Sequence, residues 1–374
     1  MMDFLNIVQS KNIIDINDFK TDKSIFLLAM SNTETAKIPG LTVAGANTEL
    51  IKYTPAADAE YIQFGRCKSI DAIPATPDGK PTPALITKTA LELANIPMLA
   101  IDAGAIVKPK IPHFNINSPS GKNIAIERAL DIKDVISNYE MGKMIGTHIS
   151  RKDDLIVIGE SIPGGTTTAL GVLSVLGINA FNKVSSSMSN NPHELKNNII
   201  KKSLVRNSIK IGEYHNDPFN AISYMGDPMM PTICGLVEEI IYNNKKIILA
   251  GGTQMCAIVA LLKALKIKLN NKLCIGTTSY VINDKSSNLI DLMNQISYDV
   301  PILYADLGLQ NSKKNGLKAY SDGFVKEGAG AGGATIAAKL KNDEITSNSF
   351  LKKIDEKYQE TIENPMIMKK EEIK

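Results

Sequence analysis

The architecture of the chain is set by the segment Asp154-Leu-Ile-Val-Ile-Gly-Glu160-Ser-Ile-Pro-Gly164-Gly165-Thr166-Thr167-Thr168-Ala169-Leu170. A short apolar run leads through a glycine turn into a helical stretch, and the same pattern recurs along the chain. The expected strands are residues 24–30, 98–102, 155–159, 247–250, 273–276 and 302–305. Short, fully apolar strands that alternate with helices are typical of a parallel sheet covered on both faces. The sequence therefore predicts an α/β fold with a doubly wound, mostly parallel sheet and helices on both faces.

Polar residues and glycines follow most of these strands. They are Ser31, Asp102, Glu160, Gly251, Gly252 and Thr277. Because ligands of doubly wound sheets bind beyond the carboxyl ends of the strands, we expect these residues to share one edge of the sheet and to mark the active site.

The two chain ends differ from this central pattern. Residues 1–20 are expected to form a short helix, and residues 347–362 carry apolar side chains at the spacing of an amphipathic helix. We expect residues 21–340 to form a Rossmann-like catalytic domain, and residues 1–20 and 341–374 to pair as a small helical lobe or a dimer contact. For the residues after Pro365, a solvated tail is the alternative.

Composition excludes several classes of protein. The net charge is only +3 with 22% charged residues, which gives no clustered basic surface for nucleic acid. The four cysteines form no CxxC pair and the four histidines have no ligand spacing, so we expect reduced thiols and no structural metal. The N-terminus has no signal-peptide pattern, and apolar runs fall short of the ~18 residues of a membrane span. The sequence predicts a soluble, cytoplasmic protein.

The turn after the strand at 155–159 is a candidate phosphate site. Amides and hydroxyl groups of Gly159, Gly164, Gly165, Thr166 and Thr167 converge where a helix begins, and a helix N-terminus attracts anions. The spacing resembles a Walker A loop, but Gly165 occupies the place of the phosphate-binding lysine, which argues against an ATPase. An N-cap with close helix packing is an equal alternative.

Three further positions are candidates on weaker grounds. Lys196 lies in the first turns of a helix after Pro192, where its ammonium group could reach an anion, although most such lysines are solvated. Gly251 and Gly252 follow another strand, and tight packing explains them equally well. Glu160 is expected to contact a ribose or support a transition state, or else to cap the following helix.

The segment near the C-terminal end, Asp322-Gly-Phe-Val-Lys-Glu327-Gly-Ala-Gly-Ala-Gly-Gly-Ala334, presents one carboxylate at a glycine-rich turn. Glu327 is therefore the candidate catalytic base. The glycines at 328, 330 and 333 also match the dinucleotide fingerprint, but a true fingerprint follows an apolar strand and opens a βαβ unit. Polar residues precede this match and no strand follows it, so we interpret the match as coincidental.

Together these motifs resemble the nicotinate-nucleotide:dimethylbenzimidazole phosphoribosyltransferase family of cobalamin biosynthesis, over residues 76–338. The family's phosphate-binding segment is similar to residues 159–167, and the segment that carries its catalytic glutamate is similar to residues 325–331. Its phosphate-contacting lysine falls on Lys196. Further similar landmarks are Thr82-Pro83, Asp102 and Gly251-Gly252, whereas the first seventy residues and the lysine-rich insertion 310–318 depart from the family pattern.

The resemblance implies the substrates and the assembly. The substrates would be nicotinate mononucleotide and a benzimidazole-type base, with no cofactor, and the protein would be a homodimer. The acceptor-base pocket would include Thr82, Pro83, Asp102 and Val325. Nicotinate mononucleotide carries its leaving group as a positively charged pyridinium, which needs no metal to depart, so the remaining tasks are to place the base behind the anomeric carbon and to remove its proton.

Glu327 suits proton removal if a dry pocket raises its pKa. Lys326 and the dipole of a following helix oppose this rise, so burial has to prevail. The hypothesis requires Glu327 and the bend after Gly159 to face each other across one cavity. Two other functions stay open: a phosphoribosyltransferase for another azole or purine acceptor, and a catalytically inactive nucleotide-binding regulatory subunit.

Overall fold

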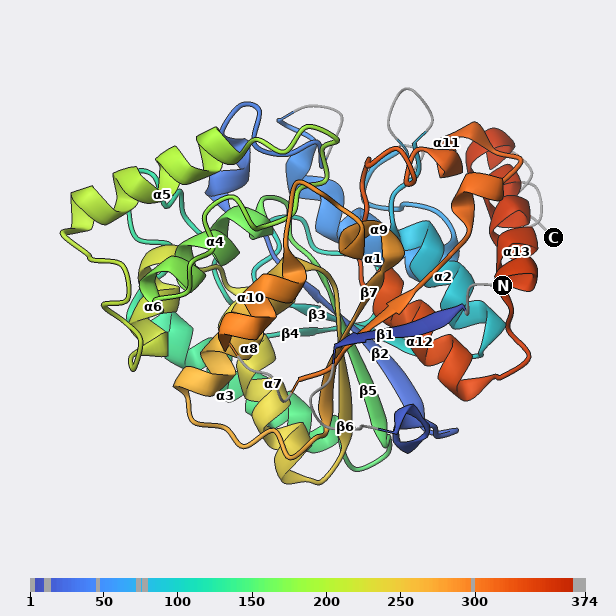
Figure 1. Ribbon diagram of the computed structural model, residues 1–374, viewed down its shortest axis with the longest axis horizontal. Coiled ribbons are helices and arrows are strands. Elements are labelled where there is room, and N and C mark those ends of the chain that lie inside the picture. Colours follow the sequence, from blue (N-terminus) through green and yellow to red (C-terminus); the bar gives the residue numbers. More distant parts are fainter. Residues whose placement is uncertain are drawn as a thin grey trace.

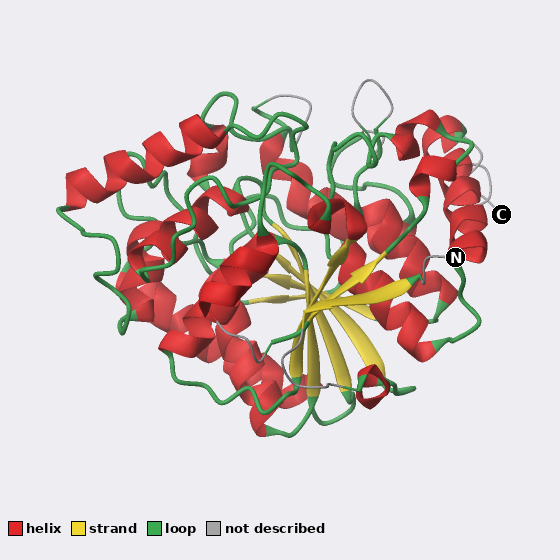
Figure 2. Cartoon of the chain, viewed as in Figure 1, coloured by secondary structure: helices red, strands yellow, loops and turns green. Residues whose placement is uncertain are grey.

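A computed structural model of the protein describes residues 4–9, 15–44, 48–71, 75, 80–296 and 300–365. One eight-stranded sheet lies at the centre, in the order β1-β8-β7-β6-β5-β2-β3-β4 (Figures 1 and 2). The strands are β1 (Leu5–Gln9), β2 (Ser24–Met30), β3 (Met98–Asp102), β4 (His113–Asn115), β5 (Leu155–Ser161), β6 (Lys246–Ala250), β7 (Leu273–Thr278) and β8 (Ile302–Ala305). All neighbouring pairs are parallel except β1 with β8. The predicted fold class is confirmed.

Helices cover both faces of the sheet and enclose two hydrophobic cores (Figure 2). Along β2, side chains at 25, 27 and 29 join one core and those at 26, 28 and 30 join the other, as the two-residue period of a strand requires. The first core takes residues from α3 (Ile132–Ile149), α4 (Gly165–Val175), α5 (His193–Asn207), α6 (Pro218–Met225), α7 (Met229–Tyr242), α8 (Thr253–Ala264) and α10 (Leu289–Ile296). The second takes residues from α1 (Thr54–Phe64), α2 (Ala84–Leu93), α12 (Ala331–Lys341) and α13 (Ser347–Tyr358).

The sheet has a topological switch point between β2 and β5. Strands β3 and β4 lie beyond β2, whereas β6, β7 and β8 follow β5 in the opposite direction. At their carboxyl ends Met30 pairs with Ser161 and Ala29 with Glu160. Connections that leave a sheet in opposite directions open a crevice at this point, which is where doubly wound proteins bind ligands.

The N-terminal segment corrects one expectation. Residues 1–20 were expected to be helical, but Leu5–Gln9 form β1, which pairs antiparallel with the otherwise open edge of β8, and Ile16–Phe19 form only a 3-10 turn. Starting a helix costs free energy, and a segment of about five residues gains too few helical hydrogen bonds to offset that cost. The unpaired edge of β8, in contrast, offers backbone hydrogen-bond partners to residues 5–9.

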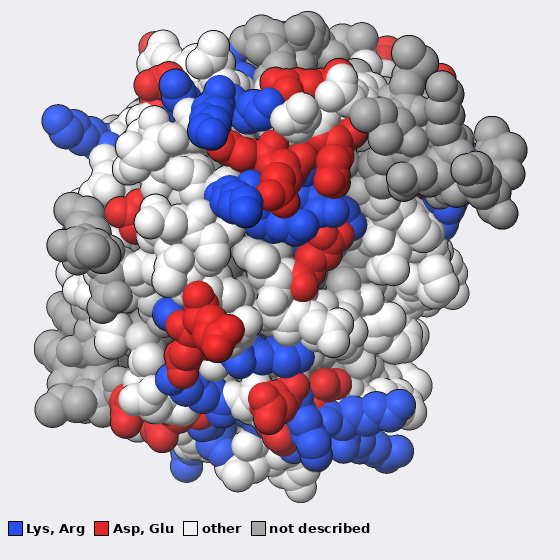
Figure 3. Space-filling model, turned by 90° about the vertical axis from the view of Figure 1, so that its right-hand side faces the viewer, with Lys and Arg blue, Asp and Glu red and all other residues white. Residues whose placement is uncertain are grey.

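The expected amphipathic C-terminal helix is confirmed as α13, which begins with a capping box between Thr346 and Ser349. The two chain ends also meet, because the rings of Phe4 and Phe350 lie 5.8 Å apart. Acidic and basic side chains alternate over this side of the molecule instead of gathering by sign (Figure 3), and the ion pair of Lys357 with Glu92 joins α13 to α2. Residues 366–374, part of the expected lobe, lie outside the described part of the chain.

Two further short α-helices are α9 (Ser279–Ile282) after β7 and α11 (Asn315–Lys318) within the lysine-rich insertion. Short 3-10 helices form at Glu34–Lys37, Ile51–Tyr53 and Leu309–Asn311, and a π-helix forms at Gln359–Glu363. Among the described residues, no helix combines the length and the apolar character that crossing a bilayer requires. The four cysteines are free thiols.

Candidate active site

A cavity of about 300 Å³ opens at the carboxyl ends of the central strands. This volume lies within the usual range for small-molecule sites. Its wall is built from residues within 41–44, 50–58, 80–83, 160–166, 185–187, 252–254 and 325–329, with Cys67, Ile70, Ala75 and Val281. Glu327 and the bend at Gly164–Thr166 therefore line the same cavity, as the hypothesis required.

The structure brings most of the predicted site residues to this cavity. Those that line it are Glu160, Glu327, Gly164, Gly165, Thr166, Gly252, Thr82, Pro83 and Val325. They come from sequence positions far apart, so the fold and not local spacing assembles the site.

Four predicted phosphate-site residues do not line the cavity, and three of them, Gly159, Thr167 and Gly251, lie at packed positions. Gly159 lies inside β5, where an added Cβ would meet Phe26 at 2.6 Å and Gly330 Cα at 3.0 Å, so this glycine lets the turn before α12 pack directly on the sheet. Thr167 is fully buried within α4. An added Cβ at Gly251 would meet only the Met255 side chain, at 3.0 Å, within the core.

Two polar predictions are corrected in the same way. Asp102 was placed in the acceptor pocket, but its Oδ1 accepts bonds from the Gly104 and Ala105 amides at 3.1 and 2.8 Å, and its Oδ2 lies 2.5 Å from Lys108. The aspartate thus closes the turn after β3. Lys196 was expected to contact a phosphate, but its buried ammonium donates to the Ser185 carbonyl at 2.7 Å, behind the cavity wall.

Glu327 lies in a turn whose backbone is strained. The φ angles of Val325, Lys326 and Ala329 are +61°, +38° and +49°, in the left-handed region that favours glycine. Such conformations cluster at functional sites because the surrounding structure enforces them. This turn, and not a strand, precedes α12, so the coincidental nature of the dinucleotide match is confirmed.

The Glu327 carboxylate lies against the N-terminus of α12. It accepts bonds from the Gly332 amide at 3.2 and 3.3 Å, from the Gly328 amide at 3.2 Å and from the Thr277 hydroxyl at 3.3 Å. Burial nevertheless raises the pKa of Glu327 to about 7, and these donors limit the rise. Burial prevails, as the sequence argument required. A carboxylate with a pKa near the working pH is suited to general base catalysis.

Glu160 is a second buried carboxylate, at the end of β5. Its Oε2 accepts from the Ile162 amide at 3.0 Å. The Gln254 carboxamide, with its nitrogen turned toward Glu160, donates to Oε1 at 2.6 Å and accepts from the Thr166 amide at 3.3 Å. Burial raises the pKa of Glu160 to about 8, and the neighbouring carboxylates add to the rise.

The sequence did not reveal a third carboxylate, Asp58 of α1. Its oxygens accept bonds from the Ser161 hydroxyl at 2.6 Å and from the Thr82 hydroxyl at 2.7 Å. Burial raises the pKa of Asp58 to about 6. The one signal available was an aspartate within the alanine-rich run 54–59, which alone does not distinguish a site residue from a solvated helix position.

The end of the cavity near α4 and α8 suits an anion. Both helices begin at the wall, at Gly165 and Thr253, so the positive ends of their dipoles meet there. Hydroxyl groups of the Ser185–Ser187 segment lie beside them. Behind this segment Lys196 adds a buried cation, although burial lowers its pKa to about 7.

Another part of the cavity wall is apolar. It includes Leu41, Val43, Leu50, Ala57 and Ile70, all from the first seventy residues. An aromatic ring would be desolvated there. Asp58 adds a carboxylate to this part of the wall, beside Thr42, Tyr53 and Thr54. Its partner Thr82 precedes Pro83, whose Cγ lies close to Gly328.

Sequence comparison places the chain in a family. A family model described as "Phosphoribosyltransferase" matches residues 87–282. The UPF0284 protein of Archaeoglobus fulgidus is 45% identical over 340 residues, which cover 91% of this chain and 94% of that protein. The UPF0284 protein of Methanosarcina acetivorans is 41% identical over 338 residues, 90% and 94% of the two chains. The chain therefore belongs to this phosphoribosyltransferase family, with archaeal UPF0284 proteins as relatives.

Solved structures share the fold. A nicotinate-nucleotide-dimethylbenzimidazole phosphoribosyltransferase from Thermus thermophilus matches with a TM-score of 0.59 at 16% identity, over 87% of this chain and 84% of that chain. A structure of CobT from Thermus thermophilus matches with a TM-score of 0.56 at 15% identity, over 85% and 83% of the two chains. These structures confirm the predicted architecture in a chain of low identity to both, and the family model confirms the predicted phosphoribosyltransferase family.

Proposed function

We propose that the protein transfers the 5-phosphoribosyl group of nicotinate mononucleotide to a benzimidazole-type base. The products are an α-ribazole 5′-phosphate and nicotinate, used for the lower ligand of cobamides. One observation carries the proposal: Glu327, with a pKa raised to about 7, lines the same cavity as the N-terminus of α4.

The cavity offers a place for each part of the reactants. The 5′-phosphate takes the end formed by Gly164–Thr166, Gly252 and the Ser185–Ser187 segment. The acceptor base takes the apolar part of the cavity, and Glu160 contacts the ribose between them. Holding both reactants in one cavity replaces a bimolecular encounter with an effectively intramolecular step.

The bond changes balance without a metal. An acceptor nitrogen attacks the anomeric carbon from the face opposite to nicotinate, and the bond from that carbon to the pyridinium nitrogen breaks. The bonding pair returns to the ring, which becomes neutral, while the N–H proton of the acceptor passes to Glu327. Attack from the opposite face inverts the β-nucleotide to the α-riboside.

The test is incubation with nicotinate mononucleotide and 5,6-dimethylbenzimidazole, with detection of free nicotinate and of the α-riboside by liquid chromatography. Formation of both products supports the proposal. Tight nucleotide binding without release from any acceptor would replace it with a catalytically inactive nucleotide-binding subunit.

A second acceptor class is favoured by Asp58. A carboxylate in an apolar wall favours a ring that carries a hydrogen-bond donor, such as a hydroxybenzimidazole or an aminopurine. Release of nicotinate with adenine or 5-hydroxybenzimidazole, but not with dimethylbenzimidazole, would establish a phosphoribosyltransferase for that other class.

Two properties of the whole protein belong to the same proposal. We expect a homodimer in the cytoplasm, since the family resemblance implies a dimer and the four free thiols fit a reducing compartment. Light scattering coupled to size-exclusion chromatography measures the assembly, and a monomeric mass would contradict it.

A further inference from the structure

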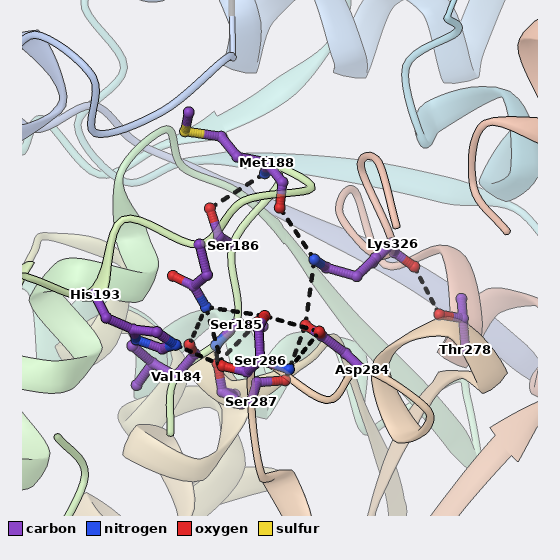
Figure 4. A network of polar contacts seen from close by, with 12 residues as sticks. Val184, Ser185, Ser186, Met188, His193, Thr278, Asp284, Ser286, Ser287 and Lys326 are labelled. Carbon is purple, nitrogen blue, oxygen red and sulfur yellow. Dashed lines mark hydrogen bonds and ion pairs between the residues drawn. The ribbon is translucent and has the colours of Figure 1, made fainter. Parts of the chain in front are cut away.

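Lys326 stands next to the proposed base but is not directed at it. Its side chain is only 3% exposed, and its ammonium lies 3.2 Å from Asp284 Oδ2 and donates to the Met188 carbonyl at 3.1 Å (Figure 4). The lysine thereby connects the turn that carries Glu327 with two other segments, the loop after α9 and residues 185–188. The Lys326 charge is therefore paired with Asp284 and not with Glu327, whereas the amides at the start of α12 do oppose the raised Glu327 pKa.

The backbone around Lys326 is fastened to the same neighbours. The Val325 amide donates to the Ser187 carbonyl at 2.9 Å, and the Thr278 hydroxyl donates to the Lys326 carbonyl at 2.6 Å. These bonds hold Val325 and Lys326 at positive φ, where a side chain costs free energy that a glycine would not. At position 326 this strain coincides with a buried and paired lysine side chain.

We propose that Lys326 is a positioning residue: its ion pair with Asp284 and its bond to Met188 hold the Glu327 turn at a fixed distance from the Ser185–Ser187 segment. This inference rests on the proposed function, because it ties the base to the wall that receives the phosphate. The general base needs accurate placement, since small displacements of a reacting group cost large factors in rate.

The geometry offers a clean way to remove the contact. Glycine prefers the φ of +38° found at position 326, so Lys326→Gly relieves backbone strain while it deletes the side chain. In this variant the Asp284 carboxylate keeps hydrogen-bond donors, because it also accepts bonds from the Ser286 amide at 2.9 Å, the Ser286 hydroxyl at 2.8 Å and the Ser287 hydroxyl at 3.1 Å.

The experiment compares Lys326→Gly with Lys266→Gly, since Lys266 is an exposed lysine that also has a positive φ, of +61°, outside the cavity wall. We expect Lys326→Gly to lower the single-turnover rate of nicotinate release at least about 10-fold, with less than about threefold change in the Kd of nicotinate mononucleotide. Lys266→Gly should keep the parental rate. A parental rate in Lys326→Gly would overturn the proposal.

A second measurement is independent of turnover. Amide hydrogen exchange of the ligand-free protein should quicken in residues 185–188, 283–287 and 325–332 of Lys326→Gly, and should stay parental elsewhere and in Lys266→Gly. Unchanged exchange in those segments would overturn the inference, whether or not the protein transfers phosphoribose. If the parental protein releases no nicotinate, the proposed function is contradicted. The hydrogen-exchange result then still shows whether Lys326 holds the Glu327 turn in place.

Adding Asp284→Asn to Lys326→Gly gives a consistency check. If the two residues act as one ion pair, the double variant should lose little more activity than Lys326→Gly alone. Multiplicative losses would contradict a shared role.

Discussion

The chemistry assigned to Glu327 depends on a single carboxylate in a dry site. We expect Glu327→Gln to fold like the parent, because the side chain keeps its shape and the Gly332 amide retains an acceptor. Turnover should fall about 10²- to 10⁴-fold, the usual contribution of a general base. Nicotinate release and thermal denaturation measure the two effects, and a rate close to the parental value would remove Glu327 from the mechanism.

Buried carboxylates also make stability depend on pH. Burial raises the pKa of Glu160 from 4.5 to about 8, so between these values the folded protein holds a proton that the unfolded chain has lost. The stabilising contribution is complete below the unfolded pKa and is lost as pH rises through the folded one. The free energy of unfolding should therefore fall across this window.

Glu160→Gln removes this titration and provides its test. Relative to the parent, the variant should be more stable at pH 8 than at pH 5, by about 3–4 kcal/mol in the difference. Urea denaturation at the two pH values measures it. A variant that gains at pH 5 and loses at pH 8 would show that the assigned direction is wrong.

Asp58 should govern the acceptor and not the nucleotide. Asp58→Asn keeps the size of the side chain but removes the charge in the apolar part of the wall. We expect the KM for an acceptor with a donor group to rise about 10-fold, with little change for nicotinate mononucleotide. The opposite pattern, a changed nucleotide KM with an unchanged acceptor KM, would move Asp58 to the ribose.

Helix α12 carries the catalytic turn and depends on close contact with the sheet. An added Cβ at Gly332 would lie 2.1 Å from the Thr277 backbone carbon, so α12 would have to move away from β7. Gly332→Ala should destabilise the protein by about 3 kcal/mol and displace the amide that binds Glu327. Chemical denaturation together with turnover tests this, and parental values of both would contradict the packing argument.

The elements that could be predicted from the sequence are those with a strong local signal. Ser24–Met30 and Met98–Asp102 were predicted with the observed bounds, because each is a nearly continuous apolar run, as is typical of strands in a parallel sheet. β4 has only three residues, half-buried at the sheet edge, and β1 is defined by its partner β8. Pairing with a distant strand leaves no local pattern in the sequence.

The site could be predicted only in part for the same reason. Glu327 and the Gly164–Thr166 bend carry motif-like spacing, but the contacts of Asp58 and Lys326 join residues separated by about a hundred positions. For Lys196 the prediction failed in the opposite way. The sequence marked the lysine as a phosphate ligand, but its buried ammonium donates to the Ser185 carbonyl behind the cavity wall. Sequence spacing predicts which residues are candidates, whereas three-dimensional packing decides which of them meet.

The two ends of the chain contact each other and the edge of the sheet. β1 covers the edge of β8, and Phe4 stacks near Phe350 of α13, so the ends stabilise each other and the sheet. Deleting residues 1–9 should lower the free energy of unfolding and expose a strand edge that promotes aggregation.

Phe350→Ala should lower the free energy of unfolding by about 3–5 kcal/mol, as for other buried aromatic residues. Because both changes remove the Phe4–Phe350 contact, the combined loss should be smaller than the sum of the two. Urea denaturation and light scattering measure these effects, and strictly additive losses would show that the two ends contribute independently.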